Sequence, residues 1–240
     1  RTFYQGGPAV SVLGVGAWSF GGGADSYWGA QDQRDVDALV SEALDVGVNF
    51  FDTAFGYNGG QSEISLGQAL RGKRDKAVIC DKLPIQEDVG GFEEAVVGGL
   101  RRLGTDYVDL LMIHWPTKDA RLLEDNLRAL ERVRQKGYIR AAAVSNFGLG
   151  TLEIARQAGV RVAANEFAYN LMTRAIEYDI LPYCQAQDIG IAAYMPIMQG
   201  ILTGKYATLS DIPDNRRRSI HFAAQGNPQV AETVAKIKSL

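Results

Sequence analysis

The sequence predicts a parallel α/β protein, a (β/α)8 barrel of the TIM type with seven strand–helix units visible. Apolar segments of strand length alternate with segments of helical length and period, at a spacing of about 30 residues, which gives right-handed crossovers and a parallel sheet. Polar residues stand repeatedly at the carboxyl ends of the strand segments, where the active site of such a barrel lies. An open doubly wound sheet is the alternative. It is disfavoured because the glycine-rich stretch 14–29 does not open a helix at once, as a dinucleotide-binding turn does.

The expected strands are mostly apolar on both faces, as buried parallel strands are. They span residues 10–18, 48–54, 76–83, 107–115, 138–146, 160–167 and 189–196. Helical periodicity predicts helices over residues 34–46, 62–71, 92–103, 122–136, 149–158, 176–187 and 227–240. Glycine precedes several of the strands and suits the left-handed residue that ends a helix. These glycines are Gly47, Gly137, Gly159 and Gly190.

No interdomain linker is visible, so residues 1–240 are expected to form a single barrel domain. The strand count stops at seven, because residues 227–240 have a helical pattern and no strand segment follows them. An open barrel would leave two unpaired strand edges. The sequence therefore predicts that the natural protein is longer than these 240 residues, or that its tail is missing here.

Composition indicates a globular protein that binds neither nucleic acid nor membrane. The chain is 46% hydrophobic and 22% charged, has a formal net charge of -3, and shows no basic cluster. No apolar run approaches the roughly 20 residues of a membrane span, and the N-terminus lacks the apolar core of a secretory signal. Cys80 and Cys184 are interpreted as core thiols in a reducing compartment. A cytoplasmic location is expected, no metal site is expected, and the oligomeric state is left open.

Four residues that can take part in proton chemistry are expected at the carboxyl ends of neighbouring strands. Asp52 ends the second strand with Tyr57 shortly after it, Lys82 ends the third, and His114 ends the fourth. Singly, each has an ordinary interpretation: a turn residue, a loop aromatic, a rim cation with a buried stem, and a core histidine. Because parallel strands end at one rim, all four are expected to converge on one site.

Motifs along nearly the whole chain resemble the aldo-keto reductase family. They are "FDTAFGYNGGQSEISLGQAL" (51–70), "LRRLGTDYVDLLMIHWP" (100–116), "AVSNF" (143–147) and "PIMQGILTGKY" (196–206). The resemblance implies the eight-stranded barrel. It also implies NADP as the cofactor, with NAD not excluded, and an activity that reduces an aldehyde or ketone, or oxidises an alcohol or sugar in reverse.

The resemblance implies that Tyr57 protonates the carbonyl oxygen as hydride arrives, while His114 bonds that oxygen. A free phenol has a pKa of about 10, so Lys82 is expected to lower the pKa of Tyr57, by about three units at most. Asp52 would keep Lys82 charged and offset part of its field, making the net lowering smaller.

Cofactor contacts follow from the resemblance, residue by residue. They fall on Trp18, Asp52, Ser145, Asn146, Glu166, Tyr194, Met195, Pro196, Ile197, Gly200 and Lys205. Ser145 and Asn146 match the turn that holds the carboxamide, Tyr194 the ring that stacks on the nicotinamide, and residues 196–205 the loop over the pyrophosphate. Trp18 matches a residue beside the ribose or substrate. Met195 replaces the family's usual serine, which puts one hydroxyl contact in doubt.

Glu166 stands where many relatives carry glutamine. A carboxylate there can still accept from the carboxamide, and its charge would favour the positive oxidised ring. The hypothesis is that Glu166 biases binding toward oxidised cofactor.

Two other groups of residues receive weaker assignments. Trp18, Tyr27, Trp28 and Trp115 suggest an aromatic-walled pocket for an aldehyde or sugar-like carbonyl. Residues 216–218 are three arginines that could reach phosphate, but a solvated loop is the preferred interpretation, and His221 receives no role.

Two other functions stay open. Potassium channel β subunits share this fold and bind a nicotinamide cofactor, yet act chiefly as regulators. Alternatively, Lys82 could form a Schiff base in a cofactor-free barrel lyase, but that chemistry needs a neutral lysine and Asp52 favours a charged one.

Overall fold

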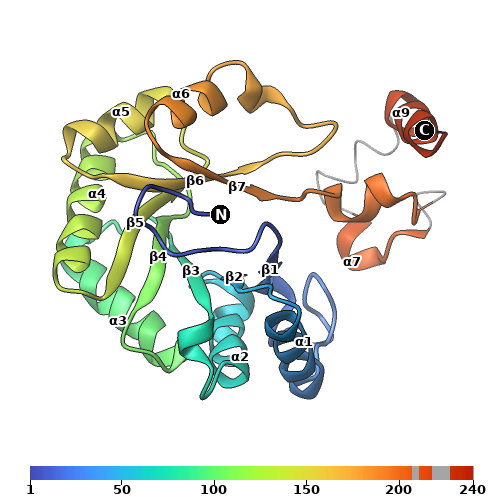
Figure 1. Ribbon diagram of the computed structural model, residues 1–240, viewed down its shortest axis with the longest axis horizontal. Helices are drawn as coiled ribbons and strands as arrows, with labels where there is room; N and C mark the ends of the chain where they lie inside the picture. The colour runs from blue at the N-terminus through green and yellow to red at the C-terminus, as the bar shows by residue number, and fades with distance from the viewer. Residues whose placement is uncertain (207–210, 218–227, 240) are drawn as a thin grey trace.

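Seven parallel strands, each hydrogen-bonded to the next in sequence, form one curled sheet with the major helices on its outer side (Figure 1). The computed structural model describes residues 1–206, 211–217 and 228–239. The strands are β1 (Gly14–Gly16), β2 (Phe50–Asp52), β3 (Val78–Leu83), β4 (Val108–Ile113), β5 (Ile139–Ser145), β6 (Val162–Ala168) and β7 (Gly190–Tyr194). This is an incomplete (β/α)8 barrel, as predicted.

Helices follow the strands in the predicted order, with one short helix, α7, that the sequence did not predict. They are α1 (Gln33–Asp45), α2 (Gln61–Ala69), α3 (Phe92–Leu103), α4 (Ala120–Gln135), α5 (Leu149–Gln157), α6 (Ile180–Ala186), α7 (Asp214–Arg217) and α9 (Pro228–Lys238). The side chains of Asp32 and Asp119 accept backbone hydrogen bonds at the first turns of α1 and α4, which satisfies donors that a helix start leaves free.

The largest boundary errors of the sequence prediction lie in the first strand and the sixth helix. Only Gly14–Gly16 of the predicted strand 10–18 pairs, because Val12 and Leu13 are exposed and a 3-10 turn begins at Ala17. The sixth helix starts at Ile180, because Asp179 caps it there after a separate 3-10 turn.

Three of the four predicted helix-ending glycines are confirmed. Gly47, Gly137 and Gly159 have φ values of 84°, 87° and 77°, in the left-handed region. Gly190 is different: it is the first residue of β7, and Asp188 takes the left-handed conformation instead, with φ 55°. Glycine is required at 190 because a Cβ there would lie 2.6 Å from the Phe3 carbonyl oxygen.

The two faces of the sheet bury different sets of side chains. Phe50 packs inside the curl against Phe3 and the cluster that contains Val10 and Met112. Phe51 points the other way and is fully buried between the sheet and the helices. The paired phenylalanines before Asp52 therefore serve both layers, as the alternation of a strand requires.

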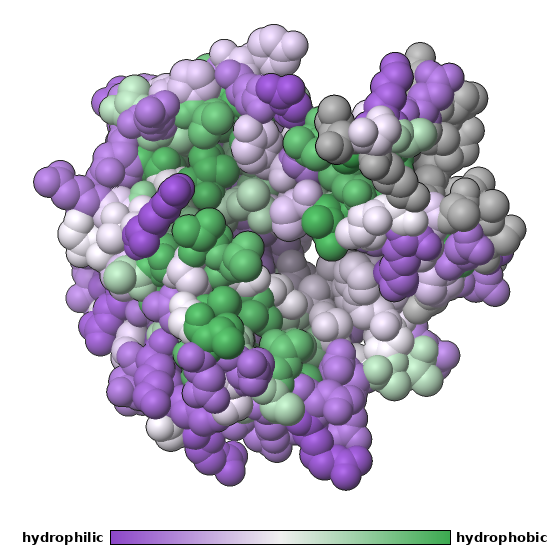
Figure 2. All heavy atoms as spheres, turned by 45° about the vertical axis from the view of Figure 1, so that its right-hand side comes forward, coloured by the Kyte–Doolittle hydropathy of each residue, from purple (hydrophilic) through white to green (hydrophobic). Residues whose placement is uncertain are grey.

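The sheet is open between β7 and β1. Within the described ranges, no eighth strand joins these two edges. The space-filling view shows hydrophobic side chains beside a hollow on this side of the molecule (Figure 2). The predicted helix at 227–240 is confirmed as α9, whereas Arg218 and His221 lie outside the described residues.

Close packing of α2 on α3 depends on Gly67. A Cβ at this position would lie 2.3 Å from the Leu103 carbonyl oxygen, which is backbone and cannot turn aside. By contrast, a Cβ at Gly98 on α3 would meet only the Arg102 side chain, at 3.5 Å.

Gly67→Ala is therefore expected to lower the free energy of unfolding by about 2–3 kcal/mol, since the two helices must separate. Gly98→Ala is the matched control. It should stabilise the protein by up to about 1 kcal/mol, because alanine favours a helix interior. Urea unfolding of both variants tests this, and equal effects would contradict the packing account.

Candidate active site

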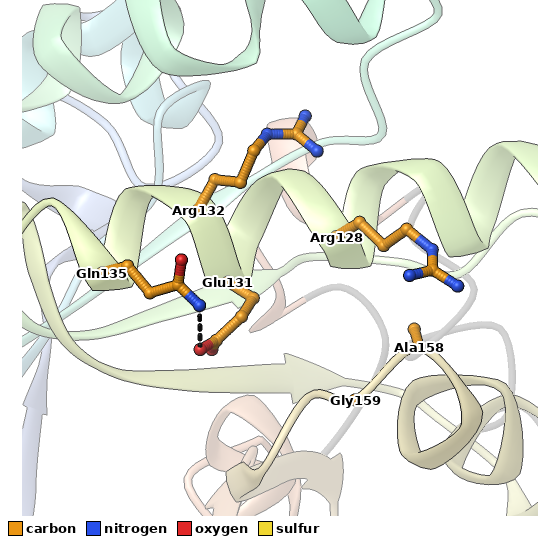
Figure 3. Close-up of a pocket in the computed structure, with 6 residues that line it drawn as sticks. All are labelled: Arg128, Glu131, Arg132, Gln135, Ala158 and Gly159. Carbon is orange, nitrogen blue, oxygen red and sulfur yellow. Dashed lines mark hydrogen bonds between the residues drawn. The ribbon is translucent and has the colours of Figure 1, made fainter.

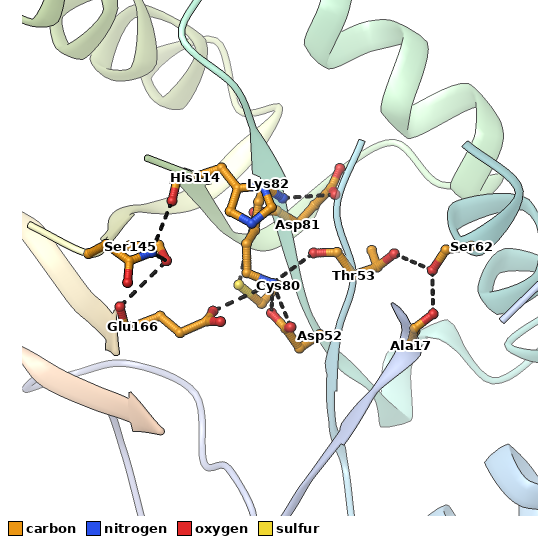
Figure 4. A network of polar contacts seen from close by, with 11 residues as sticks. Ala17, Asp52, Thr53, Ser62, Cys80, Asp81, Lys82, His114, Ser145 and Glu166 are labelled. Carbon is orange, nitrogen blue, oxygen red and sulfur yellow. Dashed lines mark hydrogen bonds and ion pairs between the residues drawn. The ribbon is translucent and has the colours of Figure 1, made fainter. Parts of the chain in front are cut away.

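A fully buried lysine, Lys82, organises the polar residues at the carboxyl ends of the strands (Figure 4). Its ammonium Nζ donates to both carboxylate oxygens of Asp52, at 2.6 and 2.5 Å, and to the Thr53 carbonyl oxygen at 3.0 Å. Glu166 lies farther off, with Oε2 3.5 Å from Nζ. The predicted convergence of Asp52 and Lys82 is therefore found in the structure.

Strand register explains why these residues meet. Asp52 at the end of β2 pairs with Cys80 of β3, and Lys82 follows two residues later on the same inward side. The backbone N–H of His114, directly after β4, donates to the Leu83 carbonyl at 2.9 Å. Each side chain is thus delivered by the end of a buried strand.

Lys82 is held in its charged form. Burial alone would lower its pKa, but the Asp52 carboxylate, with Glu166 adding to it, raises the pKa well above the ordinary value of lysine. A lysine that remains an ammonium is a poor nucleophile, so this geometry disfavours the Schiff-base alternative.

Tyr57 lies between Lys82 and His114. Nζ of Lys82 is 5.4 Å from the centre of the phenol ring, and the imidazole of His114 meets that ring edge-on, with centres 5.8 Å apart. Tyr57 opens the 3-10 turn Tyr57–Gly60, in which Asn58 (φ 50°) donates to the carbonyl oxygens of Trp18 and Phe20. This turn fixes the phenol beside the aromatic residues of the first loop.

The predicted lowering of the Tyr57 pKa is wrong for the chain as it stands. Burial is the largest effect and raises the pKa to about 12, because it penalises the phenolate. Lys82 lowers the pKa, but the negative charges of Asp52 and Glu166 act against it. Burial and the second carboxyl, Glu166, therefore outweigh the ammonium on which the expected lowering rested.

His114 is neutral over the physiological range. Burial, reinforced by the charge of Lys82, lowers its pKa to about 4. A neutral imidazole has one N–H donor and one acceptor nitrogen, so it can donate to an oxygen atom without carrying a charge.

Ser145, Asn146 and Tyr194 form a second hydrogen-bonded group beside the lysine. Asn146, with φ 63°, donates from Nδ2 to Ser145 Oγ at 2.9 Å and accepts the Tyr194 hydroxyl on Oδ1 at 2.9 Å. Its backbone N–H donates to the Glu166 carbonyl oxygen at 2.8 Å. Three of the predicted cofactor contacts are therefore joined by hydrogen bonds, two at the end of β5 and one at the end of β7.

The side chain of Glu166 faces Lys82, a contact that the sequence analysis did not predict. Its pKa is raised to about 8, first by burial and then by Asp52, with Lys82 opposing the rise. A signal for this contact was present in the sequence. Ala164, two residues earlier on β6, packs inside the curl, and strand alternation places residue 166 on the same face.

The predicted pyrophosphate loop lies on the segment that leaves β7. Met195, Met198 and Gln199 have φ values of 53°, 50° and 54°, and Gly200 has φ 100°. Pro196, Ile197 and Lys205 are exposed on this segment.

An aromatic wall flanks the tyrosine, as the sequence suggested. Trp18 stacks on Tyr27 with ring centres 4.8 Å apart and lies 5.8 Å from the ring of Tyr57. Trp28 meets Trp18 edge-on, and Trp115 lies 6.4 Å from the ring of His114. Aromatic rings therefore lie beside both Tyr57 and His114.

Two residues that the sequence analysis did not place in the site join this wall to the segment after β7. Gln199 Oε1 accepts a hydrogen bond from the Tyr27 hydroxyl at 2.6 Å. The guanidinium of Arg216 lies 5.1 Å from the centre of the Trp28 ring. Arg216 is therefore packed on an aromatic face, and the solvated-loop interpretation is wrong for it.

Both cysteines are free and buried, as predicted. Cys80 Sγ and carboxylate oxygens of Asp52 and Glu166 lie within 4.8 Å of one another, a spacing compatible with a metal ion. The Lys82 ammonium contacts both of these carboxylates, so it already supplies the positive charge that a cation would bring.

One cavity lies far from this site, on the helical exterior (Figure 3). It has a volume of about 360 Å³, and its lining comes from α4 and the end of α5: Arg128, Glu131, Arg132, Gln135, Ala158 and Gly159. It contains none of the predicted site residues.

Among the described helices, none is both long and apolar enough to cross a membrane.

Together, the curled parallel sheet and the lysine–carboxylate pair at its carboxyl rim define a (β/α)8-barrel protein with its site at the usual end of the barrel. The model of the aldo/keto reductase family matches residues 12–240. The chain belongs to that family, as its motifs implied.

Similar proteins include two that are named as reductases. The chain is 32% identical to aldo-keto reductase YhdN of Bacillus subtilis, covering 82% of this chain and 61% of that protein. It is 34% identical to methylglyoxal reductase YeaE of Escherichia coli, covering 82% of this chain and 67% of the relative. The chain therefore spans only 61–67% of the length of these relatives.

Solved structures show the same fold. Glycerol dehydrogenase AKR11B4 of Gluconobacter oxydans superposes with a TM-score of 0.84 at 30% identity, over 99% of this chain and 76% of that one. An aldo/keto reductase of Klebsiella pneumoniae in complex with NADP and acetate gives 0.70 at 30% identity, over 83% and 69%.

The low pKa of His114 gives a testable prediction. Its imidazole should titrate near pH 4, well below the ordinary value of 6.5. The unfolded chain binds this proton near pH 6.5, so the contribution of His114 to stability is complete above pH 6.5 and is lost as the pH falls toward 4. An NMR titration of the two histidines, assigned with His114→Asn, measures this directly. A midpoint near 6.5 for His114 would refute the assignment of a neutral imidazole in the site.

Proposed function

We propose that this protein is an NAD(P)H-dependent carbonyl reductase that reduces an aldehyde or ketone, or oxidises the corresponding alcohol or sugar in reverse. The observation that carries the proposal is the buried Lys82–Asp52 pair, with Tyr57 and neutral His114 beside it at one strand rim. Family membership supports it, as do the reductase and dehydrogenase names of its relatives.

The residues present fit a nicotinamide dinucleotide, which when bound supplies hydride to a carbonyl carbon. Ser145 and Asn146 offer hydroxyl and amide groups for a carboxamide, beside Glu166 and the ring of Tyr194. Gly200 has φ 100°, a conformation that side chains rarely adopt, and a Cβ there would lie 3.2 Å from the Tyr206 ring, so glycine is favoured at this position. Lys205, on the same segment, supplies a positive charge that suits a phosphate group.

NADP is the proposed cofactor. The Klebsiella pneumoniae structures hold NADP or NADPH. NAD is not excluded, since one relative in Escherichia coli is an NADH-specific methylglyoxal reductase.

In this proposal Tyr57 supplies the proton that the new alkoxide needs. Its high pKa keeps the phenol protonated at neutral pH, so the donor form is always present. As the proton leaves, the phenolate forms beside the Lys82 ammonium, which stabilises it. His114 donates its N–H to the carbonyl oxygen and fixes that oxygen near the phenol.

The substrate class is a small carbonyl compound, and the aromatic wall of Trp18, Trp28 and Trp115 supports an apolar or sugar-like body. A cytoplasmic location is also part of the proposal and rests on the two free cysteines. Residues 1–240 are proposed to belong to a single barrel domain.

A regulatory subunit is the second candidate. A probable voltage-gated potassium channel subunit beta of Oryza sativa is 30% identical, over 96% of this chain and 74% of that protein. Binding of NADPH without turnover of any carbonyl compound would favour this candidate.

Tyr57→Phe is expected to reduce kcat for carbonyl reduction by about 10² to 10⁴-fold, because it removes the proton donor and keeps the ring. NADPH binding, followed by tryptophan fluorescence, should be unchanged. Tyr178→Phe serves as the control, because Tyr178 is 90% exposed. Retained turnover in Tyr57→Phe would remove the phenol from the mechanism.

The charge of Glu166 is expected to bias cofactor binding. Below pH 8 the carboxyl is mostly neutral, and above it the carboxylate favours the positive oxidised ring. The ratio of affinities for NADP⁺ over NADPH should therefore rise between pH 6.5 and 9 in the parent protein, and stay level in Glu166→Gln. Equal ratios in both proteins at pH 9 would refute this bias.

A further inference from the structure

The ammonium of Lys82 has more acceptors than protons. Four oxygen atoms lie within 3.5 Å of Nζ: both from the Asp52 carboxylate, one from the Thr53 carbonyl and one from Glu166. An ammonium donates three hydrogen bonds. The Glu166 oxygen is the most distant of these four atoms. Asp52 is therefore the main partner of the Lys82 ammonium, and Glu166 is a weaker, competing one.

Glu166 is well placed to influence the phenol as well. It is 7% exposed, so solvent screens its charge only weakly. Its backbone pairs with Ser145 on β5 and Ala192 on β7, and its carboxyl points to the Lys82 ammonium inside the curl. The titratable groups that face it are Asp52 from β2, Cys80 and Lys82 from β3, Tyr57 from the turn after β2, and Tyr194 from β7.

Asp81 belongs to a different environment, although it precedes Lys82. Its carboxyl lies on the helical side of the sheet, where a Cβ on Gly99 would be 3.1 Å from Asp81 Oδ2 and 2.9 Å from Glu63 Oε1. Glu63 pairs there with Arg102 at 2.6 Å. The Asp81 pKa is also raised to about 8, by burial and by Glu63, so an experiment must separate Asp81 from Glu166.

We propose that Glu166 is a positioning residue for the reaction proposed above: once it is ionised, its charge beside Lys82 sets how readily Tyr57 gives up its proton. The inference rests on the proposed function for its catalytic meaning. The effect of the Glu166 charge on the ionisation of Tyr57 can be measured even in a protein that turns over no substrate.

The order of ionisation makes the coupling measurable. As the pH rises, Glu166 loses its proton near pH 8 and Tyr57 only near pH 12. In the parent protein, Tyr57 therefore always ionises against a carboxylate that is already charged. Glutamine at position 166 removes that charge and keeps a similar shape, so the phenol should ionise more easily.

The test is an NMR titration of the full chain labelled with ¹³C at tyrosine Cζ, with the Tyr57 signal identified by its loss in Tyr57→Phe. The parent protein should show a small step in the Tyr57 signal near pH 8. In Glu166→Gln this step should vanish, and the downfield movement that marks ionisation should begin about one pH unit lower. Glu153→Gln, at a partly exposed glutamate on α5, is the matched control and should behave as the parent protein does.

A second variant guards against simple disruption of the fold. Glu166→Asp keeps the charge with a shorter reach and should retain a step in the Tyr57 signal. If the step near pH 8 survives in Glu166→Gln, it belongs to Asp81 and the proposal is wrong. An unchanged onset of Tyr57 ionisation in Glu166→Gln would overturn it equally.

Activity supplies an independent measurement. The pH at which kcat for alcohol oxidation reaches half its maximum should fall by about one unit in Glu166→Gln, with little change in KM for the alcohol. If the parent protein turns over no carbonyl or alcohol substrate, the proposed function fails. The NMR titration still decides the inference in that case, so the two failures are distinguishable.

Discussion

The structure of the site depends on one buried charge, the ammonium of Lys82, and on the carboxylates that compensate it. An unpaired ion in this position would cost several kcal/mol, and removing one partner of such a pair typically costs about 3–5 kcal/mol. Asp52 supplies the compensation through two short hydrogen bonds, and Thr53 adds a carbonyl oxygen. The pKa values of Tyr57, His114 and Glu166 all respond to this ammonium, because all three are buried close to it.

The fold makes this arrangement possible by ending neighbouring parallel strands at one rim. The side chains of β2, β3 and β6 then meet at one rim, and Lys82 contacts Glu166 although 84 positions separate them in the chain. The same register presents Phe51 to the helices and Phe50 to the interior. The apolar run that precedes Asp52 anchors the carboxylate from both sides of the sheet.

Much of this could be predicted from the sequence, because strand alternation and helix periodicity are local properties. The order of the seven strands, the helices between them and the meeting of Asp52 with Lys82 are confirmed. Gly190 shows why the rest was missed. The sequence pattern predicts a helix-ending glycine at this position. Glycine is needed there because the backbone of Phe3, almost 190 positions away, leaves no room for a Cβ. The Tyr57 pKa failed for a similar reason, since burial and the Glu166 carboxyl depend on tertiary packing. Arg216 likewise finds its aromatic partner, Trp28, only in the folded chain.

The central claim is that Lys82 remains an ammonium because carboxylates surround it. The most direct measurement is an NMR titration of lysine ¹³Cε signals, with the Lys82 signal identified by its loss in Lys82→Met. The account predicts that this signal stays in its protonated position beyond pH 10.5, where ordinary lysines titrate. A midpoint at or below pH 10.5 would contradict the account, because Lys82 would then lose its charge as readily as a lysine on the surface.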